Sequence, residues 1–363
     1  MPAALRSLAL TVGTVVVAIA LLALLLAGAG YDAAEALGAL WNGAFGSWTA
    51  IASGTLLRAT PLLFTGLAVS LAFTTGILNV GAEGQLLAGA TAATAVALAM
   101  PASAGLAVTL AALAAGTLAG AAWAAVPAWL RARFGVLEVI STIMLNFVAL
   151  NVTGWLVRGP LQEPTRIYPQ SAMLDAAVRL PRLVPGTRLH AGVALAVLLA
   201  LALAWTLRAT AGGFRVRMTG ANAAAAASAG RIRTGRVVAL VFLASGALAG
   251  LGGAVEVLGV TFALYENLSP GYGYTAIAVA LLAGLRPGAA IVAALLFGAL
   301  QAGAAAMQRD AGVPAVMVSV VEGCIIVLLL ASEWVRDRAA RAATSTRGGP
   351  PTPPAHHASP TPA

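Results

Sequence analysis

The sequence contains no lysine and few charged residues of any kind. Only 9% of its 363 residues are charged, whereas 60% are hydrophobic; soluble domains have about 25% charged residues. Without lysine the chain cannot form a P-loop of its own, because that motif needs a lysine to reach the phosphates of ATP. These shortages exclude P-loop ATP binding by this chain and indicate an integral membrane protein with many spans.

Cysteine and histidine are also scarce. The single cysteine, Cys324, lies inside an apolar run, so neither a disulfide framework nor a metal cluster is expected. The adjacent His356 and His357 lie in a flexible tail, where a lone pair makes a poor metal site. The sequence has no HExxH, GxSxG or paired-cysteine motif. We therefore expect no metal, no catalytic site and no enzymatic activity in this chain.

Apolar runs long enough to cross a membrane recur along the sequence. They predict an all-α polytopic protein with about ten transmembrane helices. Six of these have both bounds, at about 8–29, 56–75, 137–157, 191–207, 237–262 and 313–331. The third span follows a glycine-broken stretch and ends near residue 100, the fourth ends near 130, the eighth at 286 and the ninth near 307. The segment 158–190 holds five prolines, which argue against a span. We expect one transmembrane domain over 1–336 and a disordered tail, rich in Pro, Ser and Thr, over 337–363.

Arginine is distributed unequally over the two sides of this arrangement. Ten spans place both termini on one side, which carries 14 arginines against 6 on the other. The positive-inside rule makes the arginine-rich side cytoplasmic. The N- and C-termini and the loop at about 208–236 are then cytoplasmic, whereas the loop at about 158–190 is extracytoplasmic. Because the arginines are scattered over loops, we expect no nucleic-acid partner.

The stretch 76–90 combines polar side chains with glycines deep in apolar sequence. Asn79, Glu83 and Gln85 lie among Gly76, Gly81 and Gly84. Polar groups and loosened backbone at membrane depth are costly unless they face protein or a water-filled path. One interpretation is a translocation path; the other is a helix that starts near Ala82, with Asn79 as its cap. The two interpretations are compatible.

A second set of polar side chains follows helical spacing. Glu138, Ser141, Thr142 and Asn146 fall on one face of the expected helix 137–157. Such a face lines a passage or forms hydrogen bonds between helices, and Glu138 is also close enough to Arg133 to cap the helix. Two further carboxylates, Glu256 and Glu322, lie in apolar sequence, and Glu256 could likewise line a path or pair with a neighbouring donor.

The cytoplasmic stretch 214–230 predicts one short helix. Asn222 is a suitable N-cap, the alanine run that follows favours helix, and Gly230 is a suitable stop. A short helix with a small-residue surface can dock in a groove on a partner protein. The alternative is a helix that lies on the membrane surface, which its weakly apolar alanine face disfavours.

Five segments together resemble the inner-membrane permease subunits of ABC importers, in the nucleoside and simple-sugar branch that includes relatives of the ribose permease. They are 79–85, 138–146, 219–230, 242–250 and 271–280. The resemblance covers about 56–331 and places the chain, as a multi-pass protein, in the bacterial inner membrane. The sequence departs from the family pattern at Ala223, because a proline commonly follows the asparagine in that family.

The resemblance implies a division of labour between subunits. In this family the cytoplasmic loop is a coupling helix that docks on the ATP-binding subunit, which here implicates Gly220, Asn222, Ala226 and Gly230. It further implies a second permease subunit, in a homodimer or a heterodimer, and an extracytoplasmic substrate-binding protein. ATP and magnesium would be bound by the partner subunit, and this chain would bind no cofactor.

These observations predict the permease subunit of an ATP-driven importer of a nucleoside or related simple sugar. The candidate path residues are Asn79, Glu83, Gln85, Glu138, Ser141, Thr142 and Asn146. The alternative is a secondary transporter of a small polar solute, coupled to ions or protons through Glu83 or Glu138. An intramembrane enzyme is the weakest reading, since no catalytic constellation is present.

Overall fold

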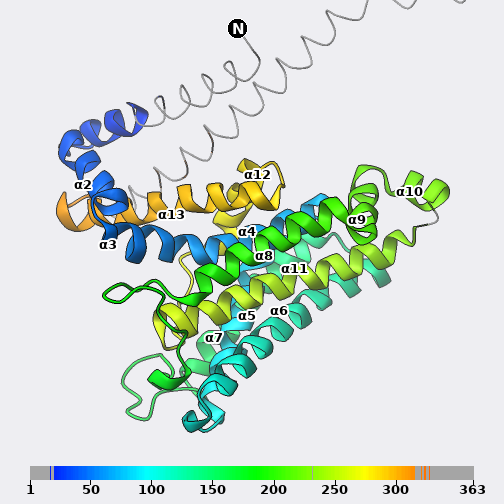
Figure 1. Cartoon of the computed structure of the whole chain (residues 1–363), viewed down its shortest axis with the longest axis horizontal. Coiled ribbons are helices and arrows are strands. Elements are labelled where there is room, and N and C mark those ends of the chain that lie inside the picture. Colours follow the sequence, from blue (N-terminus) through cyan, green and yellow to red (C-terminus); the bar gives the residue numbers. More distant parts are fainter. Residues whose placement is uncertain are drawn as a thin grey trace, which may run out of the picture.

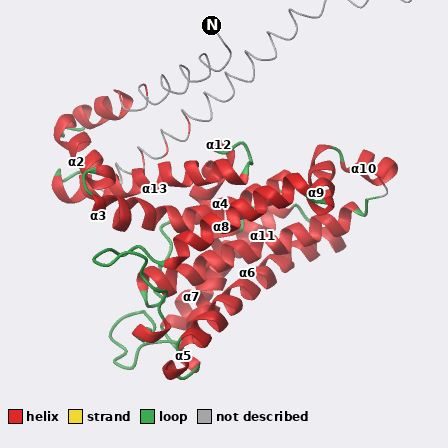
Figure 2. Cartoon of the chain, viewed as in Figure 1, coloured by secondary structure: helices red, strands yellow, loops and turns green. Residues whose placement is uncertain are grey.

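The computed structural model describes residues 20–230 and 232–314, with Val17, Val320, Gly323 and Val327 as isolated further positions. Its labelled helices are α2 Ala33–Phe45, α3 Trp48–Ala50, α4 Leu56–Thr74, α5 Ala82–Ala99, α6 Leu106–Phe134, α7 Glu138–Val157, α8 Ala191–Ala209, α9 Ala211–Ala221, α10 Ala223–Gly230, α11 Thr234–Glu256, α12 Tyr272–Leu282 and α13 Pro287–Asp310 (Figure 1). Within the described residues the chain has helices, loops and three isolated β-bridges but no strand (Figure 2). The expected all-α class is confirmed.

Six described segments are long and apolar enough to cross a membrane. They are 48–74, in which a π-helical turn joins α3 to α4, then α6, α7 and α8, then 234–261, in which a π-helical turn extends α11, and finally α13. The helix α5 adds 18 residues but is not among the six. Half of the expected first span and most of the tenth lie outside the described residues, as do Glu322, Cys324 and the tail 337–363.

The expected eighth span is much shorter than a membrane crossing. The helix α12 has 11 residues, which is a length of about 16 Å against a hydrocarbon core of about 30 Å. It begins inside the bundle, where the Tyr272 carbonyl lies 3.5 Å from the hydroxyl of Thr65 in the middle of α4. The helix ends at two residues with left-handed backbone, Gly284 and Leu285. The loop 262–271 therefore enters the bundle before α12 starts.

Glycines bring α6 and α11 into backbone contact at the centre of the bundle. Gly116 and Gly120 on α6 face Gly246 and Gly250 on α11, and each pair is spaced by four residues. A Cβ at Gly250 would overlap the Gly116 carbonyl, and one at Gly120 would overlap the Gly246 carbonyl. Such small-residue contacts allow the close backbone approach on which helix packing in lipid depends. The two helices run side by side in Figure 1.

The segment 158–190 has no helix longer than a 3₁₀ turn, so the prediction that it does not span the membrane is confirmed. It pairs with the loop before α12 through backbone hydrogen bonds from Ser171 to Leu264, 2.9 Å, and from Leu174 to Phe262, 2.8 Å. The Arg158 guanidinium also binds both carboxylate oxygens of Glu266. These contacts fix the loops to one another at one end of the bundle.

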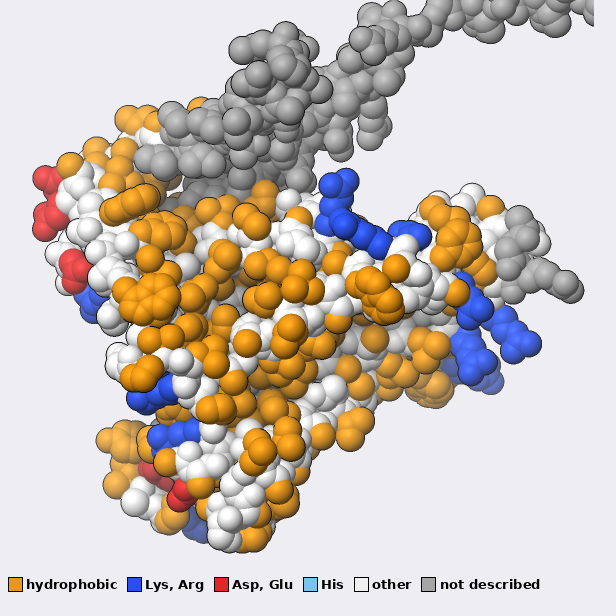
Figure 3. Space-filling view, in the orientation of Figure 1, with side chains coloured by type: hydrophobic (Ala, Val, Ile, Leu, Met, Phe, Trp, Pro, Cys, Tyr) orange, Lys and Arg blue, Asp and Glu red, His pale blue; other side chains and the backbone are white. Residues whose placement is uncertain are grey.

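The surface of the bundle is apolar along its sides and charged at its ends. Large apolar side chains such as Leu118, Trp155 and Trp205 are exposed on α6, α7 and α8. In Figure 3 basic side chains gather at the end that carries α9 and α10, whereas the acidic side chains visible in that view lie toward the opposite end. An apolar belt between charged ends is the surface of a protein that spans a membrane.

Candidate functional site

The glycine-broken stretch is a non-helical connection between two buried helices. The helix α4 ends at Thr74 and α5 begins at Ala82, while Gly76 adopts a left-handed backbone with φ +76°. The predicted start of the helix at Ala82 is confirmed. Its N-cap, however, is Gly81, and the Asn79 side chain instead accepts a hydrogen bond from the Gly81 N–H at 2.9 Å.

Asn79 and Gln85 form a reciprocal amide pair. The Asn79 Nδ2 donates to Gln85 Oε1 at 3.1 Å, and the Gln85 Nε2 donates to Asn79 Oδ1 at 3.1 Å. Asn79 Nδ2 also donates to Ser245 Oγ on α11 at 2.9 Å, and Ser245 Oγ donates to the Ala68 carbonyl on α4 at 2.7 Å. All three polar side chains are buried. They tie the broken stretch to α4, α5 and α11.

Asn146 and Glu83 extend this network to α7 and α12. Asn146 Oδ1 accepts the Gly84 N–H at 2.8 Å, and its Nδ2 donates to the Val80 carbonyl at 2.9 Å and to the Tyr274 hydroxyl at 3.3 Å. The Glu83 carboxylate accepts the Gly273 N–H at 2.6 Å. This places a carboxyl group at the N-terminus of α12, where the backbone N–H groups have no partner within the helix. The start of the short helix is thereby held beside the start of α5.

Glu138, Ser141 and Thr142 are buried beside this network but bond differently. Glu138 forms an ion pair with Arg131 at the end of α6 and accepts the Leu78 N–H at 3.4 Å. The Ser141 and Thr142 hydroxyls donate to backbone carbonyls of their own helix. The predicted common face of α7 is confirmed, since Glu138, Ser141, Thr142 and Asn146 are all buried.

We call the set Asn79, Glu83, Gln85, Asn146 and Ser245 the polar knot. Each member has at least one hydrogen-bond partner in another element of the chain. None of the five lines the groove on the outer face of α7, the cavity between α5, α6 and α7, or the pocket between α4, α8 and α13. In this conformation the polar knot holds helices together and closes the space between them. It is a junction of α4, α5, α7, α11 and α12 rather than an open passage.

Sequence reasoning missed three participants in this junction: Ser245, Gly273 and Tyr274. All three lie inside the segments 242–250 and 271–280, which carry part of the family resemblance. Their positions in those two segments were therefore the only sequence feature that could have pointed to these three residues. The third buried carboxylate that the structure describes, Glu256, is the last residue of α11 and makes no hydrogen bond to a member of the polar knot.

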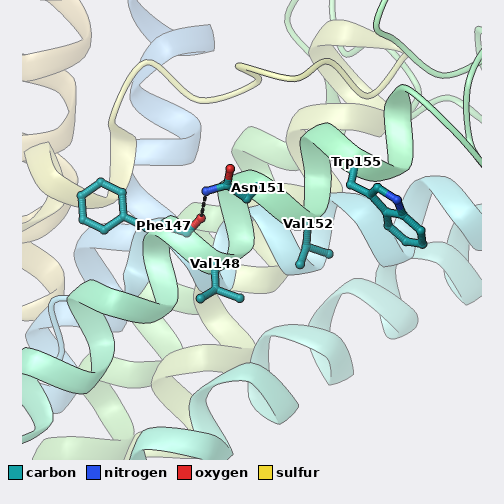
Figure 4. Close-up of a pocket in the computed structure, with 5 residues that line it drawn as sticks. All are labelled: Phe147, Val148, Asn151, Val152 and Trp155. Carbon is teal, nitrogen blue, oxygen red and sulfur yellow. Dashed lines mark hydrogen bonds between the residues drawn. The ribbon is translucent and has the colours of Figure 1, made fainter.

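The outer face of α7 carries a shallow groove of different character. It is lined by Phe147, Val148, Asn151, Val152 and Trp155, all from α7 (Figure 4). Asn151 is exposed and donates to the Phe147 carbonyl of its own helix at 2.7 Å. This face has one polar side chain, and that side chain is already partnered.

The loop after α8 contains the short helix expected between Asn222 and Gly230, which is α10, and a further helix before it, α9, that was not expected. The helix α9 ends at Ala221, Asn222 adopts an extended backbone, and α10 follows. The predicted cap is confirmed, because Asn222 Oδ1 accepts the Ala225 N–H at 2.9 Å. Ala226 is buried, whereas Ala223, Ala224 and Ala225 are exposed.

Gly220 lies against the end of α4. A Cβ at this position would overlap the Thr74 carbonyl, so only glycine allows the approach. Thr74 directly precedes the broken stretch. The loop that holds α9 and α10 therefore touches the segment that leads to the polar knot.

Comparison with known proteins gives a consistent set of relatives. Residues 51–330 match the family described as the permease component of branched-chain amino acid transport systems. The chain is 40% identical over 291 residues to a glucose ABC transporter permease protein of Haloferax volcanii, covering 77% of this chain and 76% of that protein. It is 38% identical over 318 residues to a guanosine ABC transporter permease protein of Bacillus subtilis, covering 86% and 90%. A nucleoside ABC transporter permease protein of Lactococcus lactis is 33% identical over 296 residues, covering 79% and 80%. No solved structure matches the chain.

Proposed function

The chain belongs to the family of permease components of branched-chain amino acid transport systems, and from this premise we propose that the solute it imports is a nucleoside. As a member of that family it is a multi-pass membrane subunit of an ATP-driven importer and not an enzyme. The observation that supports a nucleoside as the solute is the alignment with the guanosine permease, which covers 86% of this chain and 90% of that protein. A simple sugar is the second candidate, because the glucose permease is 40% identical.

Ten crossings with both termini in the cytoplasm agree with the arrangement of the described helices. The proposal adds α5, the combined crossing of loop 262–271 with α12, and the spans at 8–29 and 313–331 to the six long apolar segments. The basic end that holds α9 and α10 is then cytoplasmic, and the loop 158–190 is extracytoplasmic. The transmembrane domain extends over 1–336, and 337–363 is a cytoplasmic tail.

Import requires partners that bind ATP and deliver the solute. We assign ATP and magnesium to an ATP-binding subunit, delivery to an extracytoplasmic substrate-binding protein, and the other half of the path to a second permease subunit. Membership of the family supports the first two. Whether the second permease is a copy of this chain or a related chain changes none of the assignments within the protomer.

The polar knot and its neighbours on α7 are proposed as the gate of the path. Asn79, Glu83, Gln85, Glu138, Ser141, Thr142 and Asn146 surround the junction where the broken stretch meets α7 and α12. Their hydrogen bonds close the bundle in the described conformation. Alternating access requires a second packing of the same elements, in which some of these bonds are exchanged. Non-helical backbone at 75–81 and the short helix α12 are the elements best able to repack.

Coupling to ATP hydrolysis is assigned to the loop with Gly220, Asn222, Ala226 and Gly230. Asn222 caps α10, Ala226 packs inward, and Gly220 touches Thr74 beside the broken stretch. The exposed side of α10 is left for the ATP-binding subunit. Ala224→Trp should abolish ATP-dependent uptake while the protein still inserts, with Ala176→Trp in the opposite loop as the control. Normal uptake by the Ala224→Trp variant would remove the coupling assignment.

The substrate is tested by uptake in a strain that lacks this gene, with and without the gene restored. Labelled guanosine, uridine, adenosine, ribose and glucose are supplied separately, and ATP is held constant while an uncoupler is added. We expect restoration of nucleoside uptake that the uncoupler does not abolish. Restoration of glucose or ribose uptake alone would transfer the chain to the sugar importers and overturn the nucleoside assignment.

A further inference from the structure

A cavity of about 470 Å³ lies between α5, α6 and α7, and we call it the α5–α7 cavity. It begins on α5 one turn beyond Gln85, at Ala88, and extends to Pro160 and Leu161 after α7. None of the candidate path residues lines it. Its volume is within the range of about 300–1,000 Å³ that small-molecule sites occupy.

Three polar side chains are among the residues that line this cavity, and their hydrogen bonds within the described residues leave donors unused. Trp123 on α6 has a buried indole N–H without an acceptor among the described residues. Thr91 on α5 and Thr153 on α7 bond to each other at 3.2 Å, which uses only one of their two hydroxyl protons. A buried donor without a partner costs free energy, so such a group is retained where a ligand can accept its proton.

The two threonines differ from their neighbours in how they bond. Thr94 and Thr117, on the same helices as the cavity wall, donate to the carbonyl four residues earlier at 2.8 and 2.7 Å. That is the usual way for a threonine to satisfy its hydroxyl inside a membrane helix. Thr91 and Thr153 are instead turned toward each other across the space between α5 and α7, so their hydroxyls remain accessible to a third group.

The rest of the lining determines which kind of ligand fits. Six alanines and several larger apolar side chains make up most of the wall, and no charged side chain is present. A free amino acid would bring an ammonium and a carboxylate without counter-charges. A hexose would bury more hydroxyls than three polar side chains can satisfy. A nucleobase presents a flat apolar face to the alanines and the Trp123 ring, together with carbonyl and ring-nitrogen acceptors at its edge.

We propose that the α5–α7 cavity binds the base of a nucleoside, with Trp123, Thr91 and Thr153 as its hydrogen-bonding residues. This proposal rests on the proposed function and specifies it, because it assigns a site for the solute within the protomer. The cavity lies on the extracytoplasmic side of the polar knot in the proposed topology. Arg158, which precedes the lining residues Pro160 and Leu161 by two and three positions, is fixed by its bidentate bond to Glu266.

The single native cysteine allows a direct binding test. In a Cys324→Ser background, Ala92→Cys places one thiol in the cavity wall, and Ala119→Cys from α6 is a second reporter. Labelling by a maleimide is followed in the assembled transporter with guanosine, glucose or leucine present. We expect guanosine alone to slow labelling, while labelling of Ala176→Cys in the 158–190 loop is unaffected by any solute.

A pair of tryptophan variants identifies the hydrogen bond. Trp123→Phe keeps an aromatic ring but removes the N–H. The guanosine concentration that halves the labelling rate should therefore rise about fivefold, which corresponds to the loss of one neutral hydrogen bond. Trp129→Phe is the matched control, because Trp129 lies on the same helix but is exposed. The concentration that halves the labelling rate of this variant should equal that of the unchanged chain.

The outcomes separate this proposal from the proposed function. Guanosine uptake by the unchanged transporter without protection of either thiol would overturn the cavity assignment and leave the importer intact. Labelling blocked by added lipid or by the second permease subunit, with no effect of guanosine, would likewise overturn it. Protection by guanosine in a transporter that imports no nucleoside would overturn the proposed function while the binding site stands.

Discussion

The polar knot and the α5–α7 cavity share the helix α5, but their polar groups are paired in opposite ways. In the polar knot, Asn79 and Gln85 satisfy each other and Asn79 also reaches Ser245 on another helix. In the cavity, the described residues offer no acceptor to the buried Trp123 N–H and use only one of the two hydroxyl protons of Thr91 and Thr153. The two regions therefore differ in the pairing of their polar groups and not in polarity alone, and this difference is the basis of the proposed ligand site.

The two regions also differ in what surrounds them. Around the polar knot, main-chain groups complete the hydrogen bonding, as Gly84 and Val80 do for Asn146 and Gly273 does for Glu83. Around the cavity, alanine methyl groups leave open volume. A closed region of this kind suits a gate that switches between two packings, because interfaces are bistable rather than continuously deformable. An open one suits weak, transient binding of a solute that must leave again.

The largest effect is expected where the helices that hold both regions are forced apart. Gly250→Val would place side-chain atoms on the Gly116 carbonyl and the Gly120 Cα, so α11 cannot keep its position against α6. We expect little or no folded protein, measured as monodisperse material after detergent extraction. Overpacking against side chains costs about 1–3 kcal/mol, and here the obstacle is backbone, which yields less.

A glycine on the same helix is the matched control for this change. Gly235 has no atom within 4 Å of an added Cβ, and therefore Gly235→Val should be extracted and purified like the unchanged chain. If the two valine variants behave alike, the close contact of α6 and α11 does not hold the folded protein together. The contact of α6 with α11 would then also not explain how α5 is held in place beside the polar knot and the α5–α7 cavity.

Much of the fold followed from local sequence, while the connections between elements did not. The start of α5 at Ala82, the cap at Asn222 and the buried face of α7 were predictable, because capping and periodicity act over a few residues. Glu138, Ser141, Thr142 and Asn146 illustrate the limit: their spacing gave the face but not the partners. Asn146 bonds to Gly84 and Val80, more than 60 residues away, and no periodicity encodes that.

The short helix α12 and the cavity show two further limits. Hydropathy measures composition, so an apolar run up to Arg286 was interpreted as a full span. The helix begins only at Tyr272 and ends at Leu282, shortly before the left-handed residues Gly284 and Leu285. Trp123, Thr91 and Thr153 are single polar residues in apolar sequence and look like ordinary core positions. Only their missing or mutual hydrogen bonds distinguish them, and those depend on three helices at once.

The smaller and more discriminating test compares two asparagines. Asn79→Leu leaves the Gly81 N–H and both polar atoms of the Gln85 amide without their Asn79 partner. Each buried group left unpaired costs about 1–3 kcal/mol, so we expect a loss of about 3 kcal/mol or more, seen as a lower thermal denaturation midpoint in detergent.

Asn151→Leu makes the same change on the outer face of α7, where the side chain is exposed and bonds only to a carbonyl of its own helix. The midpoint should stay near that of the unchanged chain, since surface substitutions of this kind usually remain within about 0.5 kcal/mol. A large drop for Asn151→Leu would show that the outer groove is a buried interface in the assembled transporter. A negligible drop for Asn79→Leu would mean that the polar knot is not closed in the stable conformation, and the contrast with the α5–α7 cavity would then disappear, because both regions would be open to a solute.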